Sequence, residues 1–308
     1  MSITGIDALT FGVIDLDESH RFLADWGLHR DPVDPTRCTT TDGTEIFVRG
    51  ADDEDLPPAT EPGSTLRQVV WGVRTDHDLR SIAEALAGRG PIDERDGVVH
   101  AVDPFGLAIA FRISRRQDVA TIPYTQNGPG SPNRLDARAP FYDRAEPHEV
   151  SHIVLGVPDL AALEAFYVGL LGFHVSDRYR GRAVFLRASA RGNHHHLFGL
   201  NSADGAAHFN HVCFKVRDVH EVIGGGQHIV RQGWTSQAGP GRHYISSACF
   251  WYFKSPVGGA FEYAADEDMV TEAWVPKEYD MSPEIFTEWK FNLGVETGSM
   301  PIAASRPA

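Results

Sequence analysis

Cys249-Phe-Trp-Tyr-Phe-Lys-Ser-Pro-Val-Gly-Gly-Ala-Phe-Glu-Tyr263 contains two apolar segments separated by a Ser-Pro-Val-Gly-Gly turn. Short apolar runs on either side of a glycine-rich turn predict two β-strands. Tyr252 lies in the first strand and Glu262 in the second, and His243 precedes both, just after a predicted Gly239-Pro-Gly241 turn. A histidine, a tyrosine and a carboxylate from neighbouring segments can converge on one pocket.

Two further histidines lie in similar apolar strands. His152 is part of Val150-Ser-His-Ile-Val-Leu-Gly-Val-Pro-Asp159, and His211 is part of Phe209-Asn-His-Val-Cys-Phe-Lys-Val216. Two histidines and one carboxylate hold a metal on one face and leave other coordination positions open. The sequence therefore predicts a metal bound by His152, His211 and Glu262.

The first half of the chain recurs in the second half. Gly12, Asp15 and Phe22 match Gly156, Asp159 and Phe166, each at a separation of 144 residues. Helix-like stretches follow strands at 18–27, 77–88, 161–172 and 219–232, and 103–111 resembles 255–263. Each half thus holds two units of a strand, a helix and further strands. A long repeat of this kind indicates an architecture built by duplication.

The repeat also tests the predicted metal site. At the equivalent positions the first half has Ala8, Gln68 and Ala110, so all three predicted ligands are absent from it. A lone histidine in a strand is most often a packed or surface residue. The joint presence of the three ligands in only one half favours a site instead. Among the 15 histidines, those interpreted as bystanders are His20, His29, His77, His100, His174, His194, His195, His220 and His228.

Composition limits the class of function. The chain has 308 residues, 42% of them hydrophobic, and a net charge of −14, which argues against binding to nucleic acid or to an anionic membrane. The N-terminus does not resemble a signal peptide, and no apolar stretch approaches a membrane span. The three cysteines, Cys38, Cys213 and Cys249, are far apart and odd in number, so we expect reduced thiols in a cytoplasmic protein.

The ordered set of motifs resembles type I extradiol ring-cleaving dioxygenases, which are catechol 2,3-dioxygenase-like members of the vicinal oxygen chelate superfamily. The resemblance covers about residues 4–270. It is carried by the strands around His152 and His211, Asn193-His-His-His-Leu197, the Gly239-Pro-Gly-Arg-His243 segment, Tyr252 and Glu262. It implies an α+β fold of four βαβββ modules in two barrel-like, glyoxalase-like domains. The bounds predicted for the parts are 1–116 for a metal-free domain, 117–147 for a linker, 148–270 for the catalytic domain and 271–308 for a tail.

The same resemblance implies the chemistry. Fe(II), with Mn(II) as the alternative, is held by His152, His211 and Glu262, and a catechol-type diol is cleaved beside its hydroxyl groups with incorporation of both atoms of O2. His196 is assigned as the acid–base residue, and His243 and Tyr252 as contacts to the substrate. The choice of His196 over His195 rests on spacing and on the face of the strand. We also expect a homo-oligomer.

Two alternatives stay open at the level of sequence. One is another metalloenzyme of this superfamily, such as an isomerase or a glutathione transferase, which does not need His196, His243 and Tyr252 together. The other is a metal-free aromatic-binding protein on the same scaffold. The chain also departs from the biphenyl-diol branch of the family, because Tyr244-Ile-Ser-Ser247 replaces Thr-Asn-Asp after His243. The substituents of the substrate ring are therefore left open.

Overall fold

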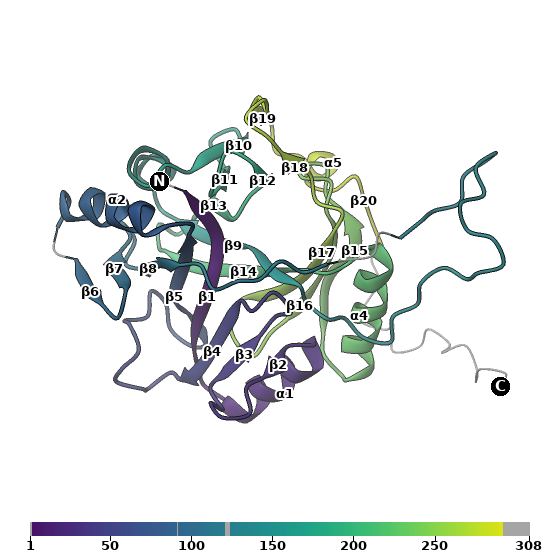
Figure 1. Cartoon of the computed structure of the whole chain (residues 1–308), viewed down its shortest axis with the longest axis horizontal. Coiled ribbons are helices and arrows are strands. Elements are labelled where there is room, and N and C mark those ends of the chain that lie inside the picture. The colour runs from purple at the N-terminus through teal and green to yellow at the C-terminus, as the bar shows by residue number, and fades with distance from the viewer. Residues whose placement is uncertain (1, 91, 121–123, 292–308) are drawn as a thin grey trace.

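The computed structural model describes residues 2–90, 92–120 and 124–291. The first half forms an eight-stranded sheet in the order β2-β3-β4-β1-β5-β8-β7-β6 (Figure 1). Its two units are β1 (Ile3–Val13), α1 (Leu16–Trp26), β2 (His29–Arg30), β3 (Arg37–Thr39) and β4 (Glu45–Gly50), followed by β5 (Thr65–Val73), α2 (Asp76–Ala87), β6 (Asp93–Arg95), β7 (Val98–Val102) and β8 (Ala108–Ile113).

The second half repeats this plan in a ten-stranded sheet, β19-β10-β11-β13-β9-β14-β17-β16-β15-β20. The predicted α+β class and the four βαβββ units are confirmed, with one extra short strand, β12. The elements are β9 (Glu149–Val157), α3 (Leu160–Glu164), the π-helical η1 (Ala165–Leu170), β10 (His174–Tyr179), β11 (Ala183–Arg187), β12 (Gly192–Asn193) and β13 (Leu197–Asn201), then β14 (His208–Lys215), α4 (Val219–Arg231), β15 (Ser236–Arg242), β16 (Cys249–Lys254) and β17 (Ala260–Ala265).

Each of the four repeated helices begins at a capping side chain. Asp15, Thr75, Asp159 and Asp218 each accept hydrogen bonds from backbone N–H groups of the first turn. Those N–H groups have no partner within the helix, so the cap fixes where the helix starts. The repeated cap explains why the helix positions could be predicted. The third helix differs from the others, because it continues from α3 into the π-helical η1.

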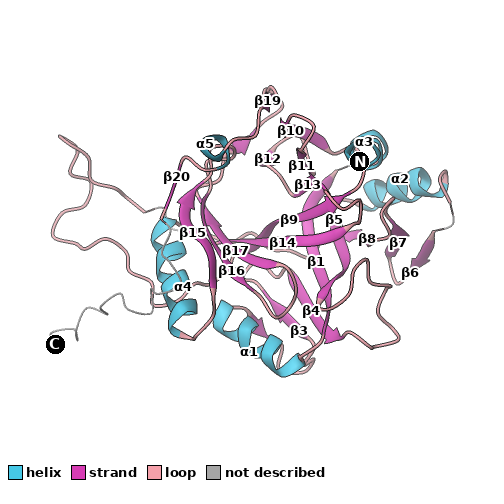
Figure 2. Ribbon diagram, turned by 180° about the vertical axis from the view of Figure 1, so that it is seen from behind, coloured by secondary structure: helices cyan, strands magenta, loops and turns pink. Residues whose placement is uncertain are grey.

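One hydrophobic core joins the two halves. Trp26 of α1 stacks on Tyr263 of β17 at 3.7 Å between ring centroids, and the Tyr263 hydroxyl donates to the Trp26 carbonyl at 2.7 Å. Trp71 of β5 meets Phe173 edge to face at 5.0 Å. The first unit therefore packs on the fourth and the second on the third, with α1 against α4 (Figure 2). Because the two halves share this core, it does not mark where one domain ends and the next begins. The predicted domain bounds therefore stay a prediction.

Trp26 is expected to be a major determinant of stability. It is fully buried and also meets Phe22, Phe214, Phe253 and Phe261. Trp26→Ala should lower the free energy of unfolding by about 3–5 kcal/mol, because it removes a large buried side chain between the halves and leaves a cavity. Denaturant titration measures this.

The matched control is Phe141→Ala, at a side chain that is 69% exposed. It should change the free energy of unfolding by no more than about 0.5 kcal/mol. A loss below about 1 kcal/mol for Trp26→Ala would mean that the halves do not depend on this contact.

The segment between the halves and the C-terminal segment behave differently. The described part of 114–148 has no helix and no named strand, and much of it projects from the body as a loop (Figure 1). The C-terminal segment instead adds strands to both edges of the second sheet. Its elements are β18 (Met269–Val270), β19 (Lys277–Tyr279) beside β10, α5 (Pro283–Phe286) and β20 (Trp289–Lys290) beside β15. The end of the predicted tail, residues 292–308, lies outside the described residues.

Two further sequence predictions can be compared with the fold. Gly239-Pro240-Gly241 is not a turn: it lies inside β15, where the pairing with β16 shifts register between Ala238 and Gly241. Gly239 has φ +106°, a conformation that favours glycine, so the glycines mark an irregular strand. Within the described residues, no helix is long and apolar enough to cross a membrane.

Candidate active site

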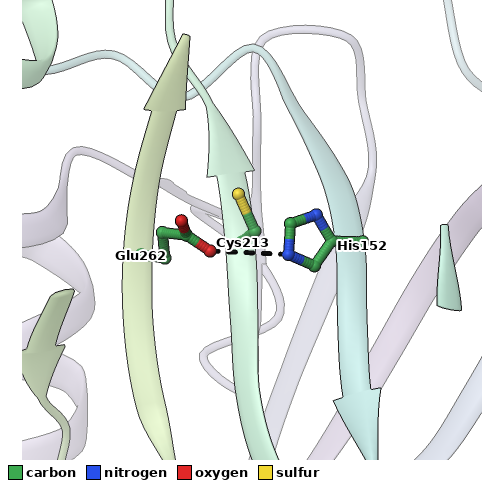
Figure 3. A group of neighbouring side chains, drawn as sticks. All are labelled: His152, Cys213 and Glu262. Carbon is green, nitrogen blue, oxygen red and sulfur yellow. Dashed lines mark ion pairs between the residues drawn. The ribbon is translucent and has the colours of Figure 1, made fainter. Parts of the chain in front are cut away.

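Three adjacent strands place the predicted metal ligands together. Cys213 of β14 pairs in register with His152 of β9 on one side and with Glu262 of β17 on the other. Figure 3 shows these three side chains converging from their strands. His211 precedes Cys213 by two residues, so it projects from the same face of β14.

The ligand atoms converge on one carboxylate oxygen. His152 Nε2 and His211 Nε2 each lie 3.4 Å from Oε2 of Glu262. Glu262 is 1% exposed, yet neither of its oxygens has an aligned hydrogen bond, and His211 Nε2 also lacks one. A buried carboxylate without such bonds is costly unless a cation neutralises it. Two imidazole nitrogens and one carboxylate oxygen fit a divalent metal.

The protonation states also suit a metal. Burial alone would raise the pKa of Glu262, but the imidazoles of His152, His211 and His243, all within ion-pair distance, outweigh it and hold that pKa well below its usual value. Burial lowers the pKa of His211. An ionised carboxylate and neutral imidazoles are the forms that bind metal.

Cys213 lies beside these ligands but is not expected to coordinate. Its sulfur is within 4.8 Å of ligand atoms of His152 and Glu262, and the residue is fully buried. Burial, together with the charge of Glu262, raises the pKa of its thiol well above the usual value. Cys213 packs in a cluster with Ala248 and Ala264, so we assign it to packing rather than to the ligand group.

The first half shows which side chains stand at the equivalent positions of the other sheet. Ala8, Val70 and Ala110 pair in the same register as His152, Cys213 and Glu262. The three residues form a small apolar cluster with Phe47 and Val98. The match confirms the alignment of the halves and shows that alanine fits this sheet in place of two of the ligands.

His243 and Tyr252 line the same cavity of about 360 Å³ as the three ligands. His243 Nε2 lies 3.0 Å from the Tyr252 hydroxyl, and His243 Nδ1 lies 3.0 Å from the Phe286 carbonyl. The carbonyl can only accept, so Nδ1 carries a hydrogen in this contact and the Tyr252 hydroxyl donates to Nε2. The structure thus brings together His152, His211, His243, Tyr252 and Glu262.

The predicted acid–base residue does not lie in this cavity. His196 lines a different cavity, against Gly5 of the first half, and its Nδ1 accepts the Ala188 N–H at 3.2 Å. Its neighbour His195 lines the cavity with the ligands, and its ring lies 4.0 Å from that of His152. The sequence assigns His196 from spacing and from the face of a predicted strand, but the three histidines lie between β12 and β13 rather than in a strand. The structure places His195, not His196, beside the ligands.

The environments of these two histidines also differ. Burial lowers the pKa of His195 well below its usual value, and the neighbouring His152 and His194 lower it further. Burial lowers the pKa of His196 to about 3. Burial thus lowers the pKa of both rings, and what distinguishes the two histidines is position, because of the two only His195 lines the cavity with the ligands.

Sequence reasoning missed the part of the site that comes from other segments. Met281 and Phe286 of the C-terminal segment line the cavity, and Phe286 also fixes His243 through its carbonyl. Glu267 lies 3.3 Å from His195 Nδ1 through its Oε1. β17 ends at Ala265, so Glu267 lies outside the strand's alternating pattern of side chains, and that pattern did not predict it.

Comparison with known proteins agrees with this geometry. The sequence profile of the Glyoxalase/Bleomycin resistance protein/Dioxygenase superfamily matches residues 149–263. Metapyrocatechase 2 of Cupriavidus necator is 28% identical over 309 residues, covering 94% of this chain and 89% of that protein.

Two solved structures show the same fold at low identity. The Mn(II)-bound glyoxalase from Novosphingobium aromaticivorans has a TM-score of 0.74 and 22% identity, covering 94% of this chain and 91% of that one. The halotolerant catechol dioxygenase BphC has a TM-score of 0.72 and 19% identity, with 94% of each chain covered.

The fold is that of the solved glyoxalase and catechol dioxygenase structures, and the second half of the chain carries a metal-type ligand group. Residues 149–263 are the part that matches the superfamily. The relative and the structural neighbours support the resemblance to type I extradiol dioxygenases that the sequence predicted.

Proposed function

We propose that this protein is an extradiol dioxygenase that opens the ring of a catechol-type substrate with both atoms of O2. The observation that carries the proposal is one cavity lined by His152, His211 and Glu262 together with His195, His243 and Tyr252. We propose Fe(II) as the metal and Mn(II) as the alternative, since both accept nitrogen and oxygen ligands. When bound, the metal would lower the pKa of the catechol hydroxyls and hold substrate and dioxygen together.

The residues around the ligands have distinct tasks. His195 takes over the acid–base role predicted for His196, because its ring lines the cavity beside the ring of His152. Tyr252 donates a hydrogen bond to a substrate oxygen. Burial and the charge of Glu262 raise the pKa of Tyr252 well above its usual value, so the donor proton is retained. Without substrate this hydrogen is donated to His243 Nε2, so the hydroxyl would turn from His243 to the substrate oxygen when substrate binds.

A second function on this scaffold, a non-oxidative isomerase reaction, is favoured by the likeness to a glyoxalase structure. That reaction requires a metal and a base but gives no reason for His195, His243 and Tyr252 to surround the ligands together. Oxygen uptake separates the two functions. A metal-free binding protein on this scaffold does not explain the buried Glu262, which lacks an aligned hydrogen bond.

The walls of the cavity point to an apolar ring substituent. Tyr179, Phe185, Phe198 and Ile245 form an apolar cluster along it, and Phe185 and Phe198 stack at 4.1 Å. Among the described residues that line it there is no lysine and no arginine. A carboxylate on the substrate would lose its hydration without gaining a cation, which is costly.

We therefore expect catechols with an alkyl or phenyl substituent to be cleaved with a kcat/KM at least about tenfold above that of a carboxymethyl catechol. Steady-state oxygen uptake with a matched series measures the ratio, and unsubstituted catechol serves as the reference. A preference for the anionic member would contradict this description of the cavity.

The proposed activity is tested by loading the protein with Fe(II) without oxygen, then adding a catechol in air-saturated buffer. Oxygen electrode and visible absorbance are followed together. Stoichiometric uptake with a yellow product is expected. Metal binding without oxygen uptake across the series would leave the metal site standing and refute the dioxygenase function. The predicted homo-oligomer and cytoplasmic location remain proposals that this experiment does not address.

A further inference from the structure

We infer that Asp177, His194 and Glu267 are positioning residues that hold His195 as its Nδ1–H tautomer, so that Nε2 presents a lone pair to the cavity. The inference deepens the proposed function, because it rests on the acid–base role of His195. It concerns a buried group of side chains on the side of His195 away from its free nitrogen.

The first arm of this group is a chain of hydrogen bonds. Asp177 Oδ2 lies 2.9 Å from His194 Nε2, and His194 Nδ1 lies 3.2 Å from His195 Nδ1. The other Asp177 oxygen, Oδ1, accepts the Lys277 backbone N–H at 2.6 Å. His194 is fully buried, and Asp177 is 2% exposed.

Donor and acceptor rules fix the hydrogens along this arm. A carboxylate only accepts, so His194 Nε2 carries a hydrogen and, in the neutral ring, Nδ1 carries a lone pair. His195 Nδ1 must then donate to it. The opposite tautomer of His195 would set two lone pairs against each other at 3.2 Å in a buried site.

The second arm acts on the same nitrogen. Glu267 Oε1 lies 3.3 Å from His195 Nδ1, within ion-pair distance but without the alignment of a hydrogen bond. Glu267 Oε2 is occupied, since it accepts the Ser151 hydroxyl at 2.6 Å and lies 3.9 Å from Lys215 Nζ. The carboxylate beside Nδ1 is a second acceptor, so it too favours a hydrogen on that nitrogen.

Nothing in the described part of the chain competes for the other nitrogen. His195 Nε2 has no hydrogen-bond partner there, while the residue lines the cavity with His152. A proton leaving a substrate hydroxyl can then form a bond to Nε2, with the electron pair of the broken O–H bond remaining on oxygen.

The direct test is the tautomer of His195 in the metal-free protein. Protein labelled with ¹⁵N-histidine is examined by long-range ¹H–¹⁵N correlation, and the His195 signals are assigned by their loss in His195→Gln. We expect Nδ1 to be protonated and Nε2 to be bare. A wild-type spectrum with the hydrogen on Nε2 would overturn the inference, whatever the protein does with catechols.

An isosteric variant then tests whether Asp177 and Glu267 determine the tautomer of His195. In Asp177→Asn the amide oxygen is expected to keep the Lys277 N–H, so its NH2 group faces His194 Nε2. His194 then donates from Nδ1 toward His195. The second change, Glu267→Ala, removes the remaining acceptor that favours a hydrogen on His195 Nδ1. The double variant should carry its His195 hydrogen on Nε2 and lose about 10²–10⁴ in kcat, the range for a general base, with KM and metal content unchanged.

The matched control makes the same chemical changes at exposed positions, Asp280→Asn with Glu278→Ala, where both carboxylates pair with Arg180. It should keep the wild-type tautomer and kcat. If the double variant does not fold, Asp177→Asn alone must raise the fraction of Nε2–H tautomer. An unchanged tautomer in a folded variant would show that these residues do not position His195.

Discussion

Glu262→Ala should bind metal at least about 100-fold more weakly than the wild type, beyond the loss typical of changes outside the ligand shell. Glu262 Oε2 is the point on which both ligand histidines converge, and it is the one formal charge among the three ligands. Turnover should be lost together with the metal. Titration calorimetry and metal analysis after gel filtration measure the effect.

The variant is expected to fold, because alanine occupies the equivalent position, Ala110, in the first half. Glu272→Ala is the matched control, since Glu272 pairs with Arg191 at the surface. It should bind metal as the wild type does. Normal metal content in Glu262→Ala would show that the ligand group is wrongly assigned.

Tyr252→Phe should keep its metal and lose about 10²–10³ in kcat, the usual cost of removing one hydrogen-bond donor aimed at developing charge. The hydroxyl is the only difference, and in the structure it donates to His243 Nε2 at 3.0 Å. The ring still packs against His211, so the ligand geometry is preserved. Steady-state kinetics on protein of known metal content separate the two effects.

Tyr244→Phe controls for the loss of a tyrosine hydroxyl near His243, because Tyr244 is half exposed. It should turn over at the wild-type rate. A Tyr252→Phe variant with full activity would remove Tyr252 from the mechanism, and one that loses its metal would make its role structural.

Much of the fold and of the ligand group could be predicted because both leave periodic signals. Asp15, Asp159 and Asp218 mark helix starts through a local hydrogen bond that depends only on nearby residues. His152 and Glu262 interrupt apolar strands, where burying a polar or charged side chain costs free energy unless it has a partner. The equivalent positions of the first half hold Ala8 and Ala110, so the repeated fold alone does not require a histidine and a glutamate there. The register of the sheets confirms this alignment of the halves.

What could not be predicted depends on contacts between distant segments. His195 lies between β12 and β13, and its neighbour His196 is held by backbone hydrogen bonds to Leu186 of β11 and Ile153 of β9, which spacing does not reveal. Phe286 reaches His243 from 43 residues away. The shared core around Trp26 likewise joins segments from opposite ends of the chain, whereas sequence patterns describe each segment alone.

The central claim, that both atoms of O2 enter the opened ring, is tested most directly by a single turnover of the Fe(II)-loaded protein under ¹⁸O2. The product is trapped at once by reduction, so that its aldehyde oxygen cannot exchange with water, and is examined by mass spectrometry. The account predicts a ring-opened product that retains two labelled oxygen atoms. An unlabelled product, or a quinone formed with hydrogen peroxide, would contradict it.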